Sequence, residues 1–463
     1  MAVTDAEAIE FGTDGWRARL TEFTVPRVRM VGQAVADHLR AEGVETGTIG
    51  VGYDARESSE GFAKELARVL AANGFDVLLP ERDCPTPVLA YAITDRNLVG
   101  GLMITASHNP PEYNGVKYIP PDAAPALPAV TDDIETRLAP PDPLPEADWG
   151  QIERRDLSHA HANHARELVP ADLSGLTVAY DAMHGSGRGV TDGLLEAAGA
   201  TVRRVRCDRD PTFGGTDPEP STENLTVLRE AVEDGSADLG VANDGDADRL
   251  AVVTPERGHL DENLLFGALY EFLLETSSGP AVRTVSTTFL IDRIARAHEE
   301  SVVEVPVGFK WVAEAMGEHD ALIGGEESGG FSIRGHIREK DGVLMALVAA
   351  AAAVERPLDA RVAALLQTHG DVHQAKRSVD CPDDRKDAVI AALGADLPES
   401  VAGEAVDSVN DADGFKILLV DGSWLLVRPS GTEPVIRVYA EADSEARVEG
   451  LLDAGVSLVE DVV

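Results

Sequence analysis

Apolar and polar positions change their period along the chain in a regular way. Runs rich in Val, Ile and Leu at 48–53 and 75–79 indicate buried strands. Residues 61–73, between these runs, place apolar side chains at the spacing of one helix face. Strands that alternate with helices predict a parallel sheet with crossover helices.

Two further rounds of this pattern follow. Each has a strand, a helix and a strand, with predicted ranges 176–181, 190–198 and 201–206 in the second round and 284–288, 290–299 and 301–305 in the third. In the second round, strands at 238–242 and 251–254 flank a turn. The segments VGYDAR at 51–56 and VAYDAMHG at 178–185 are alike, which suggests a repeated α/β unit.

The C-terminal stretch has a different pattern. A helix, three strands and a last helix are predicted at 385–393, 414–420, 424–427, 435–441 and from residue 444 onward. This order is typical of a small α+β domain. A chain of 463 residues is too long for one core, and the proline cluster at 140–145 indicates a linker.

The formal net charge is −41, because 81 Asp and Glu stand against 40 Lys and Arg, and the acids are spread along the chain. A nucleic-acid partner needs a basic face, so this class of partner is excluded. We interpret the charge as a halophilic surface in a salt-rich cytoplasm. At about 1 M salt the Debye length is roughly 3 Å, so the acids would hardly repel one another.

A membrane span and a targeting segment are not expected. The longest apolar run, at 343–354, has 12 residues, which is too short to cross a bilayer. Cys84, Cys207 and Cys381 are far apart and in no ligand spacing, which fits a reducing compartment without structural zinc. We therefore expect a soluble, cytoplasmic protein.

Residues 104–118, ITASHNPPEYNGVKY, place Ser107 just past a strand predicted at 98–104. Pro110 and Pro111 fix their own φ and restrict the residue before each of them. We predict a stiff, presented loop that is neither helix interior nor central strand. Open α/β sheets bind ligands at such strand ends, although an ordinary turn is the alternative.

Asp244, Asp246 and Asp248 follow a predicted strand at a spacing of two residues. An extended backbone would direct them to one face, where three carboxylates require a cation such as Mg²⁺ or Ca²⁺. A calcium loop is excluded, because its Gly and Glu positions hold Arg249 and Pro255. A solvated acidic loop is the alternative. Arg249 could bind the carboxylates or a phosphate.

Two more loops suit an anion and a sugar. In RPSGTEP at 428–434, Gly lets backbone N–H groups approach an anion, and Arg and hydroxyl groups add donors. In GGEESGG at 324–330, Glu326 and Ser328 could bind sugar hydroxyls, whereas a flexible acidic turn is the alternative. Lys117, Lys310 and Lys340 are three of only seven lysines, and they lie in or beside these motifs, which suggests that an ammonium is needed there.

Taken in order, these motifs resemble those of the α-D-phosphohexomutase family, the phosphoglucomutases and phosphomannomutases. The matching segments are FGTDGWR at 11–17, TASHNP at 105–110, DGDADR at 244–249, GEESGG at 325–330 and RPSGTEP at 428–434. The resemblance implies an α/β fold, with three related α/β domains of mixed, mostly parallel sheets and a C-terminal α+β domain around a central cleft. The expected domains are 1–148, 149–254, 255–370 and 371–463.

The resemblance also implies a reaction. Ser107 would carry a phosphoryl group, give it to a hexose phosphate and regain the other phosphate, with hexose 1,6-bisphosphate as intermediate and activator. Mg²⁺ would be bound by the phosphate on Ser107 and by Asp244, Asp246 and Asp248.

Other matched residues would bind the substrate or move protons. Arg17, His108 and Lys117 would lie near the transferring phosphate, with Lys117 or His108 as the proton carrier. The substrate ligands would be Arg249, Gly308, Lys310, Glu326, Ser328, Arg428, Ser430, Gly431, Thr432 and Arg437.

One position departs from the family pattern. Members that handle mannose and glucosamine often end the sugar loop in Gly-His, whereas this chain has Gly330. PVGFKW at 306–311 and GEESGG look more like the glucose-preferring branch, so glucose phosphate is expected first, mannose phosphate second and glucosamine phosphate third. A phosphatase with the same phosphoserine and a non-catalytic phosphosugar-binding protein are the alternatives, and the oligomeric state stays open.

Overall fold

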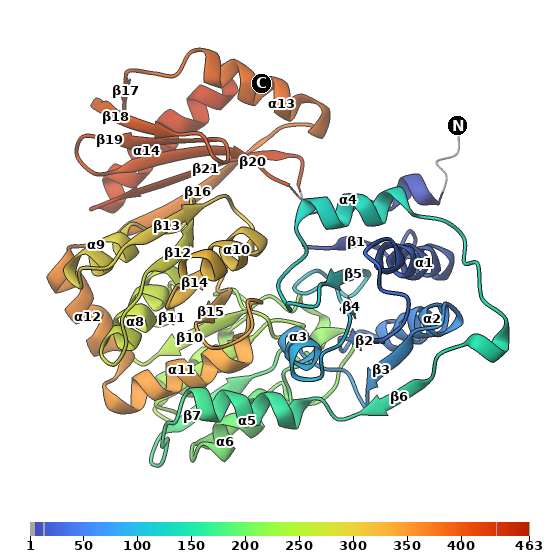
Figure 1. Cartoon of the computed structure of the whole chain (residues 1–463). Helices are drawn as coiled ribbons and strands as arrows, with labels where there is room; N and C mark the ends of the chain where they lie inside the picture. Colours follow the sequence, from blue (N-terminus) through green and yellow to red (C-terminus); the bar gives the residue numbers. More distant parts are fainter. Residues whose placement is uncertain (1–4, 13, 432, 463) are drawn as a thin grey trace.

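The computed structural model describes residues 5–12, 14–431 and 433–462. Its strands form four sheets, and each sheet with its helices makes one unit of the molecule (Figure 1). The N-terminal unit has a six-stranded sheet in the order β1-β5-β4-β2-β3-β6. Its elements are β1 Trp16–Arg19, α1 Val25–Ala41, β2 Thr48–Tyr53, α2 Ser59–Ala72, β3 Asp76–Pro80, α3 Thr86–Asp95, β4 Gly101–Ile104, β5 Tyr113–Ile119, α4 Pro128–Thr136 and β6 Ile152–Arg155.

The second unit has a five-stranded sheet in the order β11-β10-β9-β7-β8, and the third has a four-stranded sheet in the order β13-β12-β14-β15. The second unit contains α5 Ser158–Leu168, β7 Thr177–Asp181, α6 Thr191–Ala197, β8 Thr201–Val205, α7 Thr226–Glu233, β9 Leu239–Asn243, β10 Leu250–Thr254 and β11 Gly258–Leu260. The third contains α8 Glu262–Leu274, β12 Ala281–Thr284, α9 Leu290–Ala297, β13 Val302–Val305, α10 Phe309–His319, β14 Ile323–Gly325, β15 Phe331–Ile333, α11 Gly342–Glu355 and α12 Leu358–His369.

The fourth unit is an antiparallel sheet in the order β16-β21-β20-β19-β18-β17, with two helices. Its elements are β16 His373–Asp380, α13 Asp383–Ala395, β17 Ser400–Val401, β18 Glu404–Asn410, β19 Phe415–Leu419, β20 Trp424–Pro429, β21 Val435–Ala442 and α14 Glu445–Glu460. Three short 3-10 turns lie at Ala6–Ala8, Glu146–Asp148 and Phe213–Gly215. The predicted fold class, three α/β units and a C-terminal α+β unit, is confirmed.

The first three sheets share one four-stranded core. In each, a central strand (β2, β7 or β12) pairs in parallel with the next two strands of its unit, one on either side, and an antiparallel strand follows. The loop between the third strand and the antiparallel fourth strand therefore occupies the same place three times. These loops contain Ser107, the three aspartates at 244–248, and Glu326 with Ser328.

The structure corrects three sequence expectations. The strand predicted at 284–288 is β12, Ala281–Thr284, and residues 285–287 form a buried turn rich in hydroxyl groups. The segment 104–118 is a loop only in its first half, because β5 is an interior strand between β1 and β4. Pro110 and Pro111 precede this strand, so they do not interrupt its hydrogen bonds.

The proline-rich segment at 140–145 does not link two units. It leads to β6, which pairs in parallel with β3 and adds a sixth strand to the first sheet. The first unit therefore extends beyond the predicted boundary at residue 148. The connection to the second sheet runs through α5, which packs against α3.

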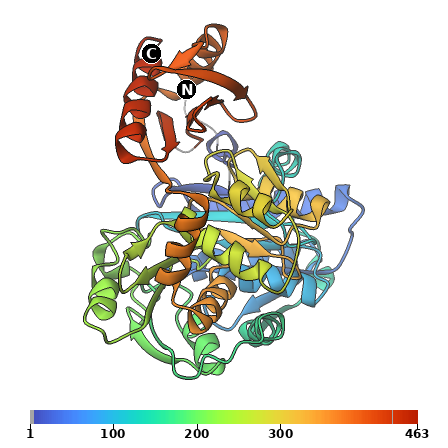
Figure 2. The same ribbon diagram turned by 90° about the vertical axis from the view of Figure 1, so that its left-hand side faces the viewer.

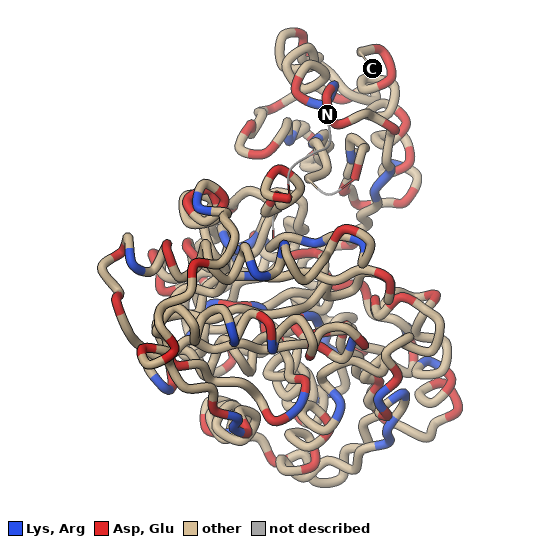
Figure 3. Tube along the Cα trace, turned by 90° about the vertical axis from the view of Figure 1, so that its right-hand side faces the viewer, with Lys and Arg blue, Asp and Glu red and all other residues tan. Residues whose placement is uncertain are grey.

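One hydrophobic core joins the first three units. It extends from α3 through β7 and β9 to α8 and α11, and α11 is buried over almost its whole length. The apolar run at 343–354 is this central helix, and no helix in the described parts of the chain is long and apolar enough to cross a membrane. The fourth unit has a separate core and stands apart in the turned view (Figure 2). Acidic residues occur on all units in view (Figure 3).

Candidate active site

Ser107 lies between β4 and β5 and is 1% exposed, so it is buried and not presented to solvent. Its φ is 50°, in the left-handed region that residues other than glycine rarely adopt. Its Oγ donates a hydrogen bond to Oδ2 of Asp244 at 2.7 Å. The side chain therefore points out of the first unit and toward the loop of the second.

Arg56 holds the Ser107 loop from behind and is itself 1% exposed. Its guanidinium donates to four backbone carbonyl oxygens, which belong to Ser107 (2.8 Å), Asn109 (2.6 Å), Pro110 (2.6 Å) and Tyr113 (3.2 Å). Its Nε donates to Oδ2 of Asp54 at 3.0 Å, and Asp54 is fully buried. Because one planar group satisfies four carbonyls, Arg56 fixes the strained backbone of this loop.

Replacing Arg56 with methionine is expected to lower the free energy of unfolding by about 3–5 kcal/mol, because it leaves Asp54 buried without its charge partner. Urea unfolding measures this loss. The exposed Arg68 on α2 is the matched control, and Arg68→Met should change the free energy by about 0.5 kcal/mol or less. Equal unfolding midpoints for the two variants would contradict this prediction.

Asp244, Asp246 and Asp248 converge in the connection between β9 and β10, with one carboxylate oxygen of each within 4.8 Å of the others. The convergence comes from a turn with Ala247 at φ 55°, and not from an extended backbone as the sequence predicted. Burial raises the pKa of Asp244 well above its ordinary value, and the negative charges of Asp248 and Asp246 add to this effect.

This group of carboxylates fits a divalent cation. Oδ1 of Asp246 and Oδ1 of Asp248 are buried, and no hydrogen-bond partner is found for either among the described residues. Buried oxygens without partners are rare in proteins, and carboxylate oxygens are the ligands that Mg²⁺ prefers. The chemistry of the donors and their unmet hydrogen-bonding capacity therefore agree on a metal site.

Two lysines close the site, one from β5 and one from the loop before α11. Lys117 on β5 places Nζ 2.9 Å from Oδ2 of Asp14 and 3.0 Å from Oδ2 of Asp248. Lys340 places Nζ 3.5 Å and 3.3 Å from the same two oxygens. Burial alone would lower the pKa of Lys117, but the carboxylates of Asp14, Asp248 and Asp246 raise it well above its ordinary value. Both lysines are ammonium ions here.

Arg17 and His108 lie beside this group. Arg17 donates to Oδ1 of Asn109 at 3.2 Å and pairs with Asp14 at 2.9 Å. Nδ1 of His108 is 3.4 Å from Oγ of Ser107. The positive charge of Arg249, together with burial, lowers the pKa of His108 to about 2, so its imidazole is neutral.

The loop at 324–330, predicted to bind the sugar and called the sugar loop below, is buried beside the start of α10. Oε1 of Glu326 accepts a hydrogen bond from the backbone N–H of Gly308 at 3.0 Å, and Gly308 has a φ of 123° that a side chain would strain. Ser328 is half-buried in the same loop, and Lys310 lies on α10 with Nζ 5.8 Å from the ring centroid of Trp311. A Cβ at Gly330 would meet Cδ of Lys340 at 2.5 Å, so Lys340 occupies the space that a side chain at 330 would need.

The predicted phosphate loop follows β20 in the fourth unit. Arg428 donates through Nε to Oδ2 of Asp413 at 2.9 Å, and the same oxygen accepts from the backbone N–H of Val307 at 3.0 Å. Asp413 thus ties this loop to the segment that leads to Gly308. Ser430 is buried, Gly431 is exposed and Arg437 on β21 pairs with Glu433, whereas Thr432 lies outside the described residues.

The structure thus brings Ser107, the three aspartates, Lys117 and Arg17 into one cluster. The ion pairs of Arg428 with Asp413 and of Arg437 with Glu433 lie within the fourth unit. The sequence predicted no role for Asp14, Arg56 or Asp413, and for Lys340 it predicted only that an ammonium is needed beside these motifs. Asp14 stands in FGTDGWR and Arg56 in VGYDAR, so both motifs carried a signal that was not used.

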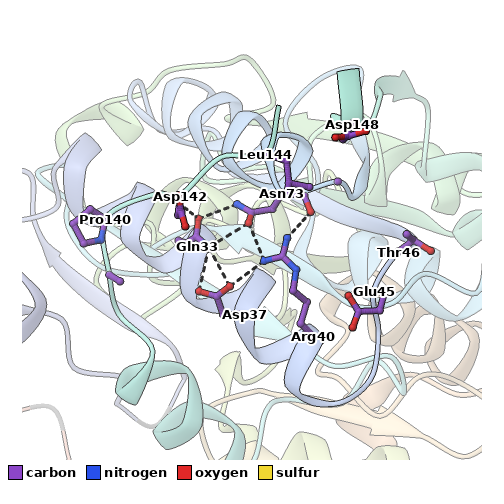
Figure 4. A pocket seen from close by; sticks show the side chains of 12 residues that line it. Gln33, Asp37, Arg40, Glu45, Thr46, Asn73, Pro140, Asp142, Leu144 and Asp148 are labelled. Atoms are coloured by element: carbon purple, nitrogen blue, oxygen red, sulfur yellow. Dashed lines mark hydrogen bonds and ion pairs between the residues drawn. The ribbon is translucent and has the colours of Figure 1, made fainter. Parts of the chain in front are cut away.

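A pocket of about 610 Å³ lies elsewhere, on the first unit beneath the proline-rich segment (Figure 4). Its polar side chains satisfy one another: Asn73 exchanges hydrogen bonds with Gln33, and Arg40 donates to Asp37 and Asn73. None of the predicted site residues that the structure describes lines this pocket. It is therefore unrelated to the Ser107 cluster.

Comparison with known proteins places these features in one family. Models of the phosphoglucomutase/phosphomannomutase alpha/beta/alpha domains I, II and III match residues 8–143, 159–258 and 261–369, and the model of the C-terminal domain matches 378–456. A Methanopyrus kandleri protein named "probable phosphoglucosamine mutase" is 34% identical over 97% of each chain. A Thermococcus kodakarensis phosphoglucomutase/phosphomannomutase is 32% identical over 98% of this chain and 99% of its own.

The fold agrees with the same family. The crystal structure of a phosphomannomutase-type protein from Thermus thermophilus superposes with a TM-score of 0.85 at 31% identity, covering 98% of this chain and 99% of that one. All four family domains match in order, and two relatives above 30% identity span nearly the whole chain. The chain therefore belongs to the phosphoglucomutase/phosphomannomutase family and is a phosphohexomutase.

Proposed function

We propose that this enzyme interconverts glucose 1-phosphate and glucose 6-phosphate through a phosphoserine at Ser107 and a hexose 1,6-bisphosphate intermediate. The observation that carries the proposal is the 2.7 Å hydrogen bond from Oγ of Ser107 to Asp244. It places a nucleophilic oxygen on the edge of a carboxylate group that fits Mg²⁺. Hexose 1,6-bisphosphate would act as the activator, because it can phosphorylate Ser107 afresh.

Four oxygen ligands would hold the metal, one from the phosphate on Ser107 and one each from Asp244, Asp246 and Asp248. When bound, Mg²⁺ neutralises charge that develops on the transferring phosphoryl group. Arg17, Lys117 and Lys340 add positive charge at the same place. Positioning and charge stabilisation are the main demands of phosphoryl transfer, and this cluster supplies both.

We propose that Lys117 donates a proton to the leaving oxygen, because Asp14 and Asp248 hold it as an ammonium. This oxygen belongs to Ser107 when the sugar is phosphorylated, and to the sugar when Ser107 is phosphorylated again. His108 lies 3.4 Å from Oγ of Ser107, but its lowered pKa makes it a weak base, so we prefer Lys117 as the proton carrier. Lys340 fills the space beside Gly330, where mannose-handling members often have a histidine side chain. We propose that its ammonium supplies positive charge on that side of the substrate.

The substrate would be held from the second, third and fourth units. Gly308, Lys310, Glu326 and Ser328 would contact the sugar, and Arg249 the transferring phosphate. The non-reacting phosphate would be bound by Arg428, Ser430, Gly431, Thr432 and Arg437. Asp413 joins the two sets, since it accepts hydrogen bonds from Arg428 and from Val307.

Glucosamine phosphate is the second candidate substrate, because relatives from Methanopyrus kandleri and Methanothermobacter thermautotrophicus are named as phosphoglucosamine mutases. Glucose 1-phosphate, mannose 1-phosphate and glucosamine 1-phosphate should be compared as competing substrates in high salt. The proposal requires the highest kcat/KM for the glucose compound. A higher kcat/KM for glucosamine 1-phosphate would assign that substrate, and net release of inorganic phosphate would indicate a phosphatase.

The salt in this assay follows from the charge. With 81 acidic residues and a net charge of −41, we propose a halophilic enzyme of a salt-rich cytoplasm. Full activity and an unchanged fold after dilution into low salt would contradict this part of the proposal.

The KM for the hexose phosphate is expected to fall by about tenfold between pH 6 and pH 8. Burial raises the pKa of Glu326 to about 7, so its carboxyl group is mostly protonated at pH 6 and mostly ionised at pH 8. Only the carboxylate accepts hydrogen bonds from two hydroxyls at once, so binding strengthens as the pH rises. Steady-state kinetics across this range measures the effect.

Glu326→Gln is the control for this pH dependence. The substrate phosphate titrates in both proteins, so the difference between the two KM profiles reports on Glu326 alone. The variant should have a raised KM and should lack the additional fall. A profile parallel to that of the wild type would show that another group is responsible.

A further inference from the structure

A cluster of histidines lies outside the residues that the reaction uses, where the first three units meet. His161 and His164 come from α5, Tyr91 from α3, and His336 from the loop before α11. The ring of His336 lies 5.1 Å from that of His164 and 5.6 Å from that of His161, measured between centroids. Tyr91 stacks on His164 at 4.8 Å.

Asp341 is the centre of this cluster. Its Oδ2 accepts hydrogen bonds from Nε2 of His161 at 2.6 Å and from Nε2 of His336 at 2.7 Å, and these three side chains are fully buried. Its Oδ1 accepts from the backbone N–H of Leu344 at 2.7 Å and caps α11. The bond from His161 therefore fixes the start of α11 relative to α5, while the bonds from His336 and Leu344 hold the preceding loop and cap the helix.

Asp341 is adjacent in sequence to Lys340, whose backbone leads directly into α11. Nζ of Lys340 lies 3.5 Å from Asp14 of the first unit and 3.3 Å from Asp248 of the second, although the residue itself belongs to the third. The position of this ammonium thus depends on how α11 begins. A displacement of about 1 Å in a catalytic site can cost a factor of about 100 in rate.

We propose that His161 and His336 are positioning residues, which act through Asp341 to hold Lys340 against the transferring phosphoryl group. The side-chain hydrogen bonds and ring contacts of the two histidines go to Asp341, Tyr91, His164 and each other, and not to a predicted substrate ligand that the structure describes. Burial alone would raise the pKa of Asp341, but its two histidine partners keep the pKa below the ordinary value. The carboxyl group is therefore ionised and accepts hydrogen bonds from both rings. This inference rests on the family's mutase activity and on the proposed role of Lys340.

Two histidines and an aspartate could also bind a metal such as Zn²⁺. Metal binding would use Nε2 of both rings and would move their protons to Nδ1. Nδ1 of His161 and Nδ1 of His336 are buried, and neither has a hydrogen-bond partner among the described residues. With metal bound, both Nδ1 atoms would be buried N–H donors without a partner, which is costly. With Nε2 donating to Asp341, each Nδ1 carries no proton and is only an unpaired acceptor. The hydrogen-bonded arrangement is therefore favoured.

The test compares His161→Ala with His164→Ala. Both histidines lie on α5 and contact the same rings, but only His161 bonds to Asp341. We expect His161→Ala to lower kcat by about tenfold with KM within about twofold of wild type, and His164→Ala to keep both within about twofold. His161→Gln retains a donor near the place of Nε2 and should recover most of the lost kcat.

Lys340→Met separates positioning from a general loss of structure. If His161 acts through Lys340, then His161→Ala should cost nothing further in the Lys340→Met background. The idea is overturned if the two losses multiply, if His161→Gln gives no recovery, or if kcat falls only as far as the folded fraction measured by circular dichroism. If His161→Ala does not fold, His336→Gln and His336→Ala are compared in the same way.

Two other outcomes have clear meanings. One zinc per chain in the purified wild type, absent from His161→Ala and present in His164→Ala, would identify a metal site and overturn the positioning role. A wild type that converts mannose or glucosamine 1-phosphate but not glucose 1-phosphate would contradict the glucose proposal alone. The comparison of variants is then made with the substrate that is converted.

Discussion

Ser107→Ala is expected to lower the turnover of hexose phosphate by about 10⁴-fold or more, because the variant lacks the oxygen that we propose carries the phosphoryl group. Oγ of Ser107 donates to Asp244 at the edge of the aspartate cluster, and Arg56 fixes the loop of Ser107 by donating to four backbone carbonyl oxygens. Conversion of glucose 1-phosphate in the presence of hexose 1,6-bisphosphate measures the loss. Mass spectrometry of the peptide that contains residue 107 tests for the phosphoryl group.

Ser332→Ala is the matched control for this variant. Ser332 on β15 is fully buried and donates a hydrogen bond to the carbonyl oxygen of Ile337 at 2.7 Å, so its removal costs a comparable buried bond. This control should keep turnover within about twofold, since it lies outside the cluster. Unimpaired turnover in Ser107→Ala would refute the phosphoserine mechanism.

Removal of Mg²⁺ by a chelator is expected to lower turnover by about 10³-fold, and added Mg²⁺ should restore it. Asp244, Asp246 and Asp248 are buried together, and two of their oxygens lack hydrogen-bond partners among the described residues. Lys117 and Lys340 offset part of this charge through Oδ2 of Asp248, and Lys117 also lies 3.5 Å from Oδ2 of Asp246, but neither pairs with the Oδ1 atoms that lack partners. The remaining negative charge can bind a divalent cation.

Asp246→Asn gives a second measure of the same site. Without metal, this variant should be at least as stable as the wild type, because it removes one of three mutually repelling charges. Mg²⁺ should raise Tm in the wild type and leave Tm of the variant nearly unchanged. Asp359→Asn is the control, since Asp359 is also buried and hydrogen-bonded but lies outside the cluster. An equal Mg²⁺ effect in all three proteins would contradict the assignment.

Much of the fold followed from periodicity. The strand predicted at 48–53 is β2, and the strands and helices of the second round agree with the structure to within one or two residues. Long alternating patterns are reliable because burial demands the same spacing from every residue on a face. The error at 284–288 arose because this segment is rich in β-branched residues, which favour strands, whereas residues 285–287 form a buried turn.

The site was only partly predictable. Ser107, the aspartates and the loop at 324–330 stood in recognisable motifs, and the sequence placed Ser107 and the aspartates after predicted strands. Their shared position, between the third strand and the antiparallel fourth strand of three equivalent sheets, became apparent only from the strand order. The prediction that three aspartates converge was right, but the stated cause was wrong, since a turn and not an extended strand brings them together.

The sequence by itself determined the family, the fold class and the residue types of each loop, because these depend on local periodicity and on motifs within a few residues. Only the tertiary structure decided that Ser107 is buried, that Arg56 holds its loop, and that Lys340 of the third unit reaches Asp14 and Asp248. Such contacts join residues up to 326 positions apart. Their geometry depends on how three sheets pack on one core, which no local pattern specifies.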